Sequence, residues 1–169
     1  TENVLMLASV LPSMTTIKLA ACEPHVVDLC HFLIGLGVKI DGIGTTTLLV
    51  TGKESLRGTE HTLIPDANEA ATFLILGAAT GSPLTVVNAR EEHLDAVLEK
   101  LREFGAGFAI EDNQITVIPG TLEAVTKVDT RVYPGIPTDV QAPFGVLATQ
   151  AVGETLIHDP LFEGRFNYV

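Results

Sequence analysis

An internal repeat is the feature that most limits how this 169-residue chain can fold. The segment 23–37 (EPHVVDLCHFLIGLG) aligns with the segment 91–105 (EEHLDAVLEKLREFG), which lies 68 residues later. The matched pairs include His25 with His93, Leu33 with Leu101, and Gly37 with Gly105. A chain that repeats at a fixed spacing builds one supersecondary unit several times. We therefore expect copies of a single unit.

Each copy has the pattern of a helix, a strand, a second helix and a strand hairpin. Apolar residues of the second copy recur with helical period, at Leu94, Val97, Leu98, Leu101 and Phe104. Glu91 and Glu92 suit the first turn of that helix, and Gly105 is a typical helix stop. The runs 84–87 and 115–118 are short and rich in β-branched residues, which predicts strands.

A third copy begins but does not finish. At an offset of 72 residues, the matched pairs are Pro65 with Pro137, Gly81 with Gly153, and Leu84 with Leu156. This alignment predicts a helix over 142–152 and a strand over 155–158. Both ends of the chain fall inside the repeating pattern, so we expect an internal piece of a longer protein. The predicted fold class is α/β (α+β), with helices packed against mixed sheets.

The segment 53–59 (KESLRGT) separates the first copy from the second. It is polar and contains Gly58, so it is a candidate for a domain boundary. A plain surface loop explains the same composition equally well.

Charge and composition exclude several classes of function. Ten Lys and Arg residues against 21 Asp and Glu residues give a net charge of −11, which argues against a nucleic-acid surface. A phosphorylated small molecule can still bind where a few cations converge. The apolar run 70–79 is half the roughly 20 residues needed to cross a bilayer. We therefore expect neither nucleic acid nor membrane as a partner.

The two cysteines, Cys22 and Cys30, match no zinc or disulfide spacing. They are expected to be buried thiols in a reducing compartment. No basic segment precedes an apolar run, so no signal peptide is predicted, and a cytoplasmic location follows. No metal or other cofactor is expected.

Five segments, in order along nearly the whole chain, resemble one known family. They are IKLAACEPHVVDLCHFLIGLGVKI, HTLIPDANEAATFLI, EHLDAVLEKLREFGA, YPGIPTDVQAPF and FEGRF. The most specific pieces are PTDVQ (137–141) and FEGRF (162–166). Together they look like the enolpyruvyl transferases, and more like the branch acting on UDP-N-acetylglucosamine than the shikimate-pathway branch.

The resemblance implies two similar domains, each built from three βαβαββ units around packed helices, with substrates bound between the domains. Residues 1–62 would be the last unit of the first domain. Residues 63–169 would be the first unit and part of the second unit of the second domain. The implied reaction transfers the enolpyruvyl group of phosphoenolpyruvate to the 3-hydroxyl of UDP-N-acetylglucosamine and releases phosphate. This is the first committed step of peptidoglycan precursor synthesis, and so implies roles in cell wall growth, cell shape and division.

The same resemblance implies a short set of site residues. Asp139 would be catalytic, contacting the reacting sugar hydroxyl and taking its proton. Leu161 would contact the UDP-sugar through its main chain. Arg165 would bind substrate near the cleft, with Glu163 as a supporting residue of the same motif. Gly164 replaces the Asn that the family usually has there.

The resemblance also assigns supporting roles to Asp66 and Glu69. Ala67 stands between them where the family usually has Arg, so this network is either rebuilt or belongs to a divergent member.

The residues also allow simpler interpretations. Asp139 follows Pro137-Thr138 at a predicted helix start, where a carboxylate commonly caps the helix or occupies its first turn. Arg165 fits a solvated charge equally well. His25 and His93 occupy matching places in the repeat, which favours a shared structural role over catalysis.

Several segments implied by the resemblance have no counterpart in these residues: a Lys-Asn pair that holds phosphoenolpyruvate, a loop with a reactive Cys, and a later Arg. We therefore expect the 169-residue chain to be inactive alone, and to associate with itself through apolar surface. One alternative is a non-catalytic α/β binding or assembly module that kept the fold. Another is an RNA-processing cyclase of related architecture, which the acidity and PTDVQ disfavour.

Overall fold

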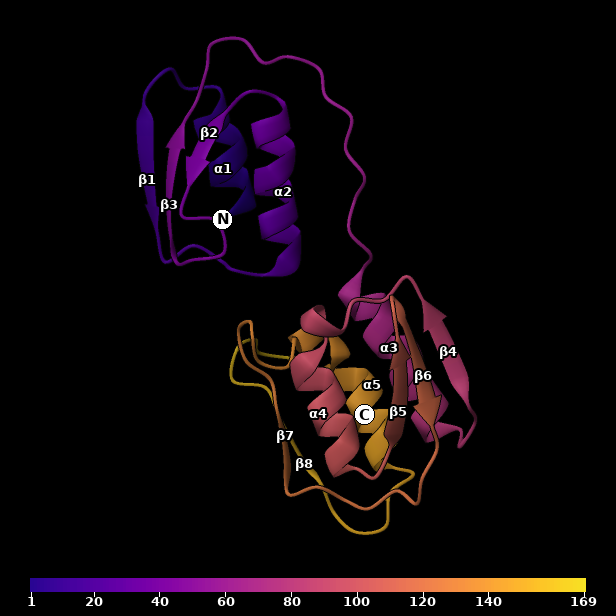
Figure 1. Ribbon diagram of the computed structural model, residues 1–169. Coiled ribbons are helices and arrows are strands. Elements are labelled where there is room, and N and C mark those ends of the chain that lie inside the picture. The colour runs from indigo at the N-terminus through magenta and orange to yellow at the C-terminus, as the bar shows by residue number, and fades with distance from the viewer. The chain divides into compact units, whose positions relative to one another are not determined.

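The computed structural model describes all 169 residues, and the chain divides into two compact units (Figure 1). The first unit is Thr1–Ile64 and the second is Pro65–Val169. The division follows residue 64, and the family resemblance implied a boundary after residue 62. It also lies beyond the polar segment 53–59.

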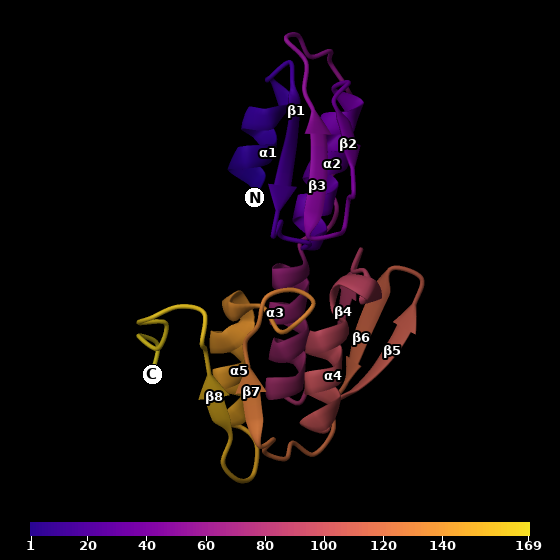
Figure 2. The same cartoon turned by 90° about the vertical axis from the view of Figure 1, so that its left-hand side faces the viewer.

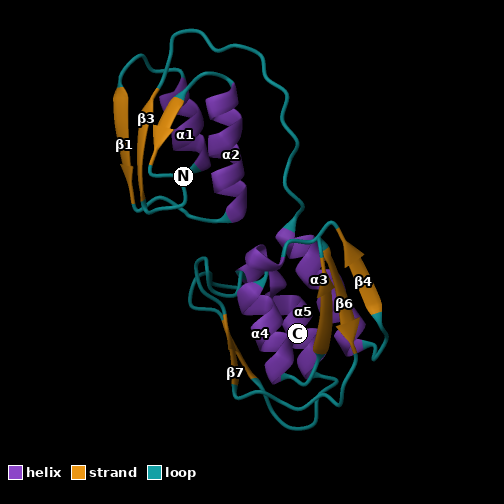
Figure 3. Cartoon of the chain, viewed as in Figure 1, coloured by secondary structure: helices purple, strands orange, loops and turns teal.

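The first unit is one sheet with two helices on a single face (Figure 3). Its elements are α1 (Glu2–Ser9), β1 (Met14–Lys18), α2 (Pro24–Gly35), β2 (Lys39–Asp41) and β3 (Thr47–Thr51). The strand order is β1-β3-β2, and both pairings are antiparallel. Alternate residues of β3 are buried, because Leu48 and Val50 face α1 and α2 in the core of this unit.

The second unit repeats this arrangement and adds a further strand–helix–strand segment. Its helices are α3 (Ala67–Ala79), η1 (Glu91–His93), α4 (Asp95–Glu103), η2 (Thr138–Val140) and α5 (Gln141–Ala148). Its strands are β4 (Leu84–Val87), β5 (Gly107–Glu111), β6 (Gln114–Ile118), β7 (Lys127–Asp129) and β8 (Leu156–His158). One sheet has the antiparallel order β4-β6-β5, and the other is the parallel pair β7-β8.

The three α-helices of this unit lie between its two sheets, as both views show (Figures 1 and 2). One continuous apolar core joins them, and the rings of Phe104 and Phe144 stack at 6.2 Å at its centre. Both rings are fully buried. Burial of one such ring stabilises the fold by about 1.5–3 kcal/mol. This core fixes α5, and with it the turn η2 that precedes α5.

The predicted repeat is confirmed in its order of elements and in its helix stops. Gly37 follows α2 and Gly105 follows α4, with φ of 103° and 101°, a left-handed conformation that favours glycine. A Cβ at Gly105 would also lie 2.4 Å from the Thr121 carbonyl oxygen. The two glycines therefore end equivalent helices for the same backbone reason.

Two predicted helix boundaries were wrong. Glu91 and Glu92 form the short turn η1 instead of the first turn of α4, because Leu94 has a non-helical φ of −121° that separates the two. The helix predicted over 142–152 ends at Ala148. None of the helices is long and apolar enough to cross a membrane.

Candidate functional site

The parallel strands β7 and β8 bring two loops together. The chain runs from β7 through η2 and α5 to β8, and the last residues in register are Asp129 and His158. Because adjacent parallel strands end at the same edge of a sheet, the segments that follow them meet there. These segments are 130–140, which contains η2, and 159–165, which we call the 159–165 loop.

Asp159 ties these two segments to each other. Its Oδ2 accepts hydrogen bonds from the Thr138 hydroxyl and from Gln141 Nε2, the latter at 3.0 Å. Its Oδ1 accepts from the Leu161 backbone N–H at 2.9 Å. Removal from water raises the pKa of this carboxyl, but the hydrogen bonds, led by Thr138, outweigh that effect and hold the pKa below its ordinary value. A charged Asp159 therefore fastens η2 to the 159–165 loop.

Asp139 is the middle residue of η2, and its side chain is 58% exposed. In a 3₁₀ turn successive side chains point about 120° apart. Thr138 therefore faces Asp159, while Asp139 faces other elements. Its Oδ2 accepts from Asn68 Nδ2 at 3.2 Å, and its Oδ1 accepts from Arg165 Nη1 at 3.3 Å.

The interpretation of Asp139 as a helix cap is wrong. Asp139 lies in the first turn, as the sequence indicated, but its side chain makes no capping hydrogen bond to η2 or α5. Pro137, with extended backbone, is the residue before η2. The carboxylate is thus free of a local backbone role.

Arg165 reaches Asp139 from the 159–165 loop. Its guanidinium carbon lies 4.8 Å from the centre of the Phe162 ring, which supports the side chain from one face. The Arg165 side chain is 42% exposed. Arg165 is therefore an exposed charge, as the simpler interpretation has it, that is also stacked on a ring and paired with a carboxylate.

The amino end of α3 supplies the third side of the site. Asp66 caps this helix, since its Oδ1 accepts from the backbone N–H groups of Asn68 at 2.8 Å and Glu69 at 3.1 Å. Ala67 is the first residue of the helix, and the Glu69 side chain is exposed in the first turn. Asp66 thus supports the site by fixing the helix turn that carries Asn68.

The remaining predicted residues lie on the 159–165 loop without touching Asp139. The Leu161 N–H is occupied by Asp159, so its carbonyl oxygen is the main-chain group left to accept a hydrogen bond. Glu163 is exposed, and its side chain makes no hydrogen bond or ion pair. The structure therefore brings together Asp139 and Arg165, but leaves Glu163 apart.

A second charged cluster surrounds Asp129, the last residue of β7. Asp129 contacts His158 Nδ1 at 2.6 Å, Lys127 Nζ at 3.0 Å and Arg131 Nη2 at 2.5 Å. The hydrogen bond from His158, followed by that from Lys127 and the charge of Arg131, lowers the pKa of Asp129 to about 2. This cluster joins the two parallel strands at the edge from which the site loops emerge.

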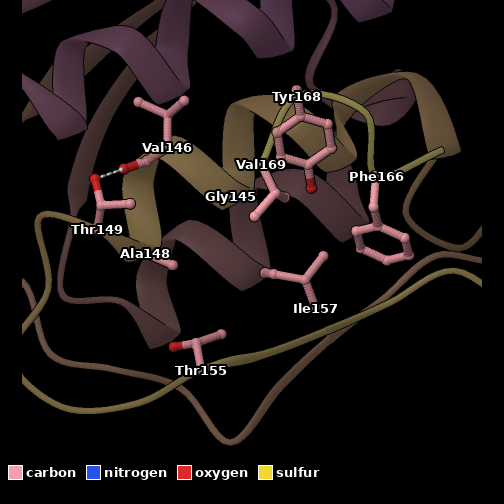
Figure 4. Close-up of a pocket in the computed structure, with 9 residues that line it drawn as sticks. All are labelled: Gly145, Val146, Ala148, Thr149, Thr155, Ile157, Phe166, Tyr168 and Val169. Atoms are coloured by element: carbon pink, nitrogen blue, oxygen red, sulfur yellow. Dashed lines mark hydrogen bonds between the residues drawn. The ribbon is translucent and has the colours of Figure 1, made fainter.

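A separate hollow of about 400 Å³ lies between α5, β8 and residues 166–169 (Figure 4). Its walls include Val146, Ile157, Phe166 and Tyr168. Burial, together with the charge of Asp159, raises the pKa of the Tyr168 phenol. The hollow contains none of the predicted site residues and no charged side chain, so it does not suit a phosphorylated substrate.

Two site residues were missed by the sequence interpretation, Asn68 and Asp159. Asn68 lies 71 residues before Asp139, and no spacing connects them. Asp159 follows a predicted strand and precedes Pro160, and a polar residue at a strand end is a weak signal that could have been used.

The arrangement is suited to accepting a proton or hydrogen bond from a ligand hydroxyl. Asp139 is an exposed carboxylate beside a guanidinium that can hold an anion. No group of three His, Cys, Asp or Glu side chains is placed to hold a metal ion.

Comparison with known proteins assigns the chain. The sequence pattern of the EPSP synthase (3-phosphoshikimate 1-carboxyvinyltransferase) family matches residues 1–169. The chain belongs to this family. The resemblance of the five segments to enolpyruvyl transferases is thereby confirmed.

Curated relatives within the family carry a more specific name. Proteins named UDP-N-acetylglucosamine 1-carboxyvinyltransferase from Sulfurimonas denitrificans and Koribacter versatilis are 47% and 44% identical to this chain. They match 100% and 98% of it. The chain spans 40% and 38% of their lengths, so it corresponds to only part of such a protein.

A solved structure agrees with the fold. The enolpyruvyl transferase NikO from Streptomyces tendae superposes with a TM-score of 0.83 at 27% sequence identity. The match covers 97% of this chain and 40% of NikO. The predicted enolpyruvyl-transferase-like fold class is confirmed.

Proposed function

We propose that the full-length protein transfers the enolpyruvyl group of phosphoenolpyruvate to the 3-hydroxyl of UDP-N-acetylglucosamine, with release of phosphate. One observation carries this proposal: relatives named for this carboxyvinyl transfer match the whole chain at up to 47% identity. The exposed Asp139–Arg165 pair supports it, because the reaction needs a proton acceptor beside an anion-binding group. The product would feed peptidoglycan precursor synthesis, and through it cell shape and division.

Asp139 is the proposed proton acceptor. A carboxylate with the ordinary acidity of Asp does not deprotonate an alcohol by itself. Proton removal must therefore accompany attack of the hydroxyl oxygen on the substituted enolpyruvyl carbon, while the neighbouring CH2 carbon gains a proton. Loss of that proton, with cleavage of the carbon–oxygen bond to phosphate, then releases phosphate and restores the double bond at the attacked carbon. Activation of that carbon needs a proton donor and further cations. We assign these groups to parts of the longer protein, and so expect the 169-residue chain alone to be inactive.

Arg165 and Leu161 are the proposed substrate-binding residues. The Arg165 guanidinium, stacked on Phe162 and paired with Asp139, is placed to bind an anionic substrate group. The Leu161 carbonyl is the group proposed to contact the UDP-sugar. Asp66 supports the site through the helix turn that it caps, and the resemblance also implies supporting roles for Glu163 and Glu69.

The two units have a proposed place in the longer protein. Thr1–Ile64 would end its first domain, and Pro65–Val169 would begin its second. Cys22 and Cys30 are both unpaired, which supports the proposed cytoplasmic location.

The test is phosphate release by the purified full-length protein. We expect release with phosphoenolpyruvate and UDP-N-acetylglucosamine, and none above background when 3-phosphoshikimate replaces the nucleotide sugar. The reverse preference would contradict the proposed substrate. Binding of UDP-N-acetylglucosamine without any turnover would instead support the non-catalytic module.

A further inference from the structure

Asp139 is held from two sides by side chains of different elements. Arg165 contacts Oδ1 from the 159–165 loop, and Asn68 contacts Oδ2 from the first turn of α3. The two hydrogen bonds, at 3.3 Å and 3.2 Å, use one oxygen each. A carboxylate fixed through both oxygens cannot rotate freely about its terminal bond, although its side chain is 58% exposed.

The two contacts differ in character. Arg165 is a cation that a substrate anion would compete for, because its guanidinium is exposed beside Asp139. Asn68 is neutral and less exposed, and its amide donates without competing for an anion. If substrate draws Arg165 away, Asn68 is the contact that continues to orient the carboxylate.

The α3 turn that carries Asn68 is itself rigid. Asp66 accepts from the Asn68 backbone N–H, and the Asn68 carbonyl accepts from the Thr72 hydroxyl at 2.8 Å. One turn further, Ala71 and Leu74 are buried in the core. The Asn68 backbone is therefore anchored on both sides, so its side chain can impose a direction on Asp139.

We propose that Asn68 is a positioning residue, which orients the Asp139 carboxylate for proton acceptance from the substrate hydroxyl. This inference rests on the proposed function. Asn68 does not touch substrate in this role and acts only through Asp139. Misplacement of a reacting group by about 1 Å can lower a rate by about 100-fold. Loss of one of two orienting contacts is expected to have a smaller effect.

The first experiment uses Asn68→Ala in the full-length protein. We expect kcat to fall about 5- to 50-fold, with KM for UDP-N-acetylglucosamine changed less than threefold, because binding groups are untouched. Asn68→Gln, which keeps the amide on a longer side chain, should recover part of the loss. An Asn68→Ala variant within twofold of the parent kcat would overturn the proposal.

The second experiment uses Asn68→Asp, which replaces the donor by a carboxylate of the same shape. The charged groups on elements around η2 are Arg165, Glu163, Asp159, Asp66 and Glu69, and only Arg165 contacts Asp139. A new carboxylate at about the distance of Asn68 disfavours ionisation of its neighbour. The acid limb of the kcat–pH profile should move upward by about one pH unit.

Phe73→Asp is the matched control, because it adds the same charge further along α3, at a position that is 50% exposed and that leaves the Thr72–Asn68 hydrogen bond intact. Its acid limb should stay within about 0.2 pH unit of the parent. Equal shifts in Phe73→Asp and Asn68→Asp would overturn the proposal, since a general charge effect would then explain both.

A double-mutant cycle separates this inference from the proposed function. Melting midpoints of Asn68→Ala, Asp139→Ala and the double variant need no turnover. We expect Asn68→Ala to have a smaller effect when Asp139 is already Ala, because the contact is then absent. Strict additivity would refute the contact itself. If the effects are non-additive but the full-length protein does not transfer the enolpyruvyl group, the contact is real and the proposed function is refuted. The assigned role of Asn68 in proton acceptance is then refuted as well.

Discussion

Replacing Asp159 by Ala removes the carboxylate that joins η2 to the 159–165 loop. The side chain accepts three hydrogen bonds, from Thr138, Gln141 and Leu161. Hydrogen bonds to charged groups contribute about 1.5–3 kcal/mol each when buried, and neutral ones about 1 kcal/mol. Because Asp159 is only half-buried, we take about 1 kcal/mol for each bond, or about 3 kcal/mol in total.

Asp159→Asn should cost less, about 1–2 kcal/mol. Its remaining carbonyl oxygen can still accept from Leu161, while the Thr138 hydroxyl can reverse and accept from the new amide. Glu163→Ala is the control, because this exposed carboxylate of the same loop makes no contact. Its effect should lie within about 0.5 kcal/mol.

The assay is urea unfolding of the chain and its variants at neutral pH, repeated at decreasing pH. The pKa of Asp159 is lowered in the folded state, so its contribution is present above the ordinary value of 3.8 and is lost as the pH falls through the folded value. The difference between parent and Asp159→Ala should therefore shrink below pH 3.8. A difference under about 0.5 kcal/mol at neutral pH would refute the network.

Three further predictions concern other parts of the chain. Asp129→Asn should lower the melting midpoint at neutral pH. The difference from the parent should disappear as the pH falls from 3.8 to about 2, because the hydrogen bond from His158 helps to lower the pKa of Asp129 to about 2. A difference that does not change with pH would contradict this. Phe144→Ala should destabilise the second unit by about 3–5 kcal/mol in denaturant titrations, because it removes a fully buried ring. A loss of unfolding free energy under about 1 kcal/mol would contradict the shared core. The isolated chain should self-associate or bind a hydrophobic dye, because apolar side chains are exposed on α1 and in the turn after it. These are Val4, Leu7 and Leu11, which are 47%, 60% and 40% exposed. A monomeric sedimentation profile without dye binding would count against this prediction.

The repeat could be predicted from the sequence because the local helix-stop residues fall at matching positions when one copy is aligned with the other. Gly37 and Gly105 mark equivalent helix ends, and both have the left-handed backbone expected of a stop. The break at Leu94 could not be predicted, because its neighbours continue the helical pattern. Leu94 itself is buried in the core of the second unit, at the point where η1 and α4 separate.

The candidate site was only partly predictable. Asp139 and Arg165 were identified by resemblance, and the parallel pairing of β7 with β8 explains why they meet. The contact of Asp139 with Asn68, by contrast, joins two helix starts that no periodicity relates. The cap interpretation of Asp139 failed because Asp159, a residue distant in sequence, fixes the orientation of η2 through Thr138.

The central claim is that Asp139 accepts the proton of the substrate hydroxyl, and Asp139→Asn in the full-length protein tests it most directly. Asn keeps the size of the side chain and can still bond Arg165, so the melting midpoint should change little. Removal of a general base typically lowers kcat by about 10²–10⁴-fold, and we expect a loss in this range with KM nearly unchanged. An Asp139→Asn variant with kcat within about threefold of the parent would contradict the account, since an effect of general-base size would be absent.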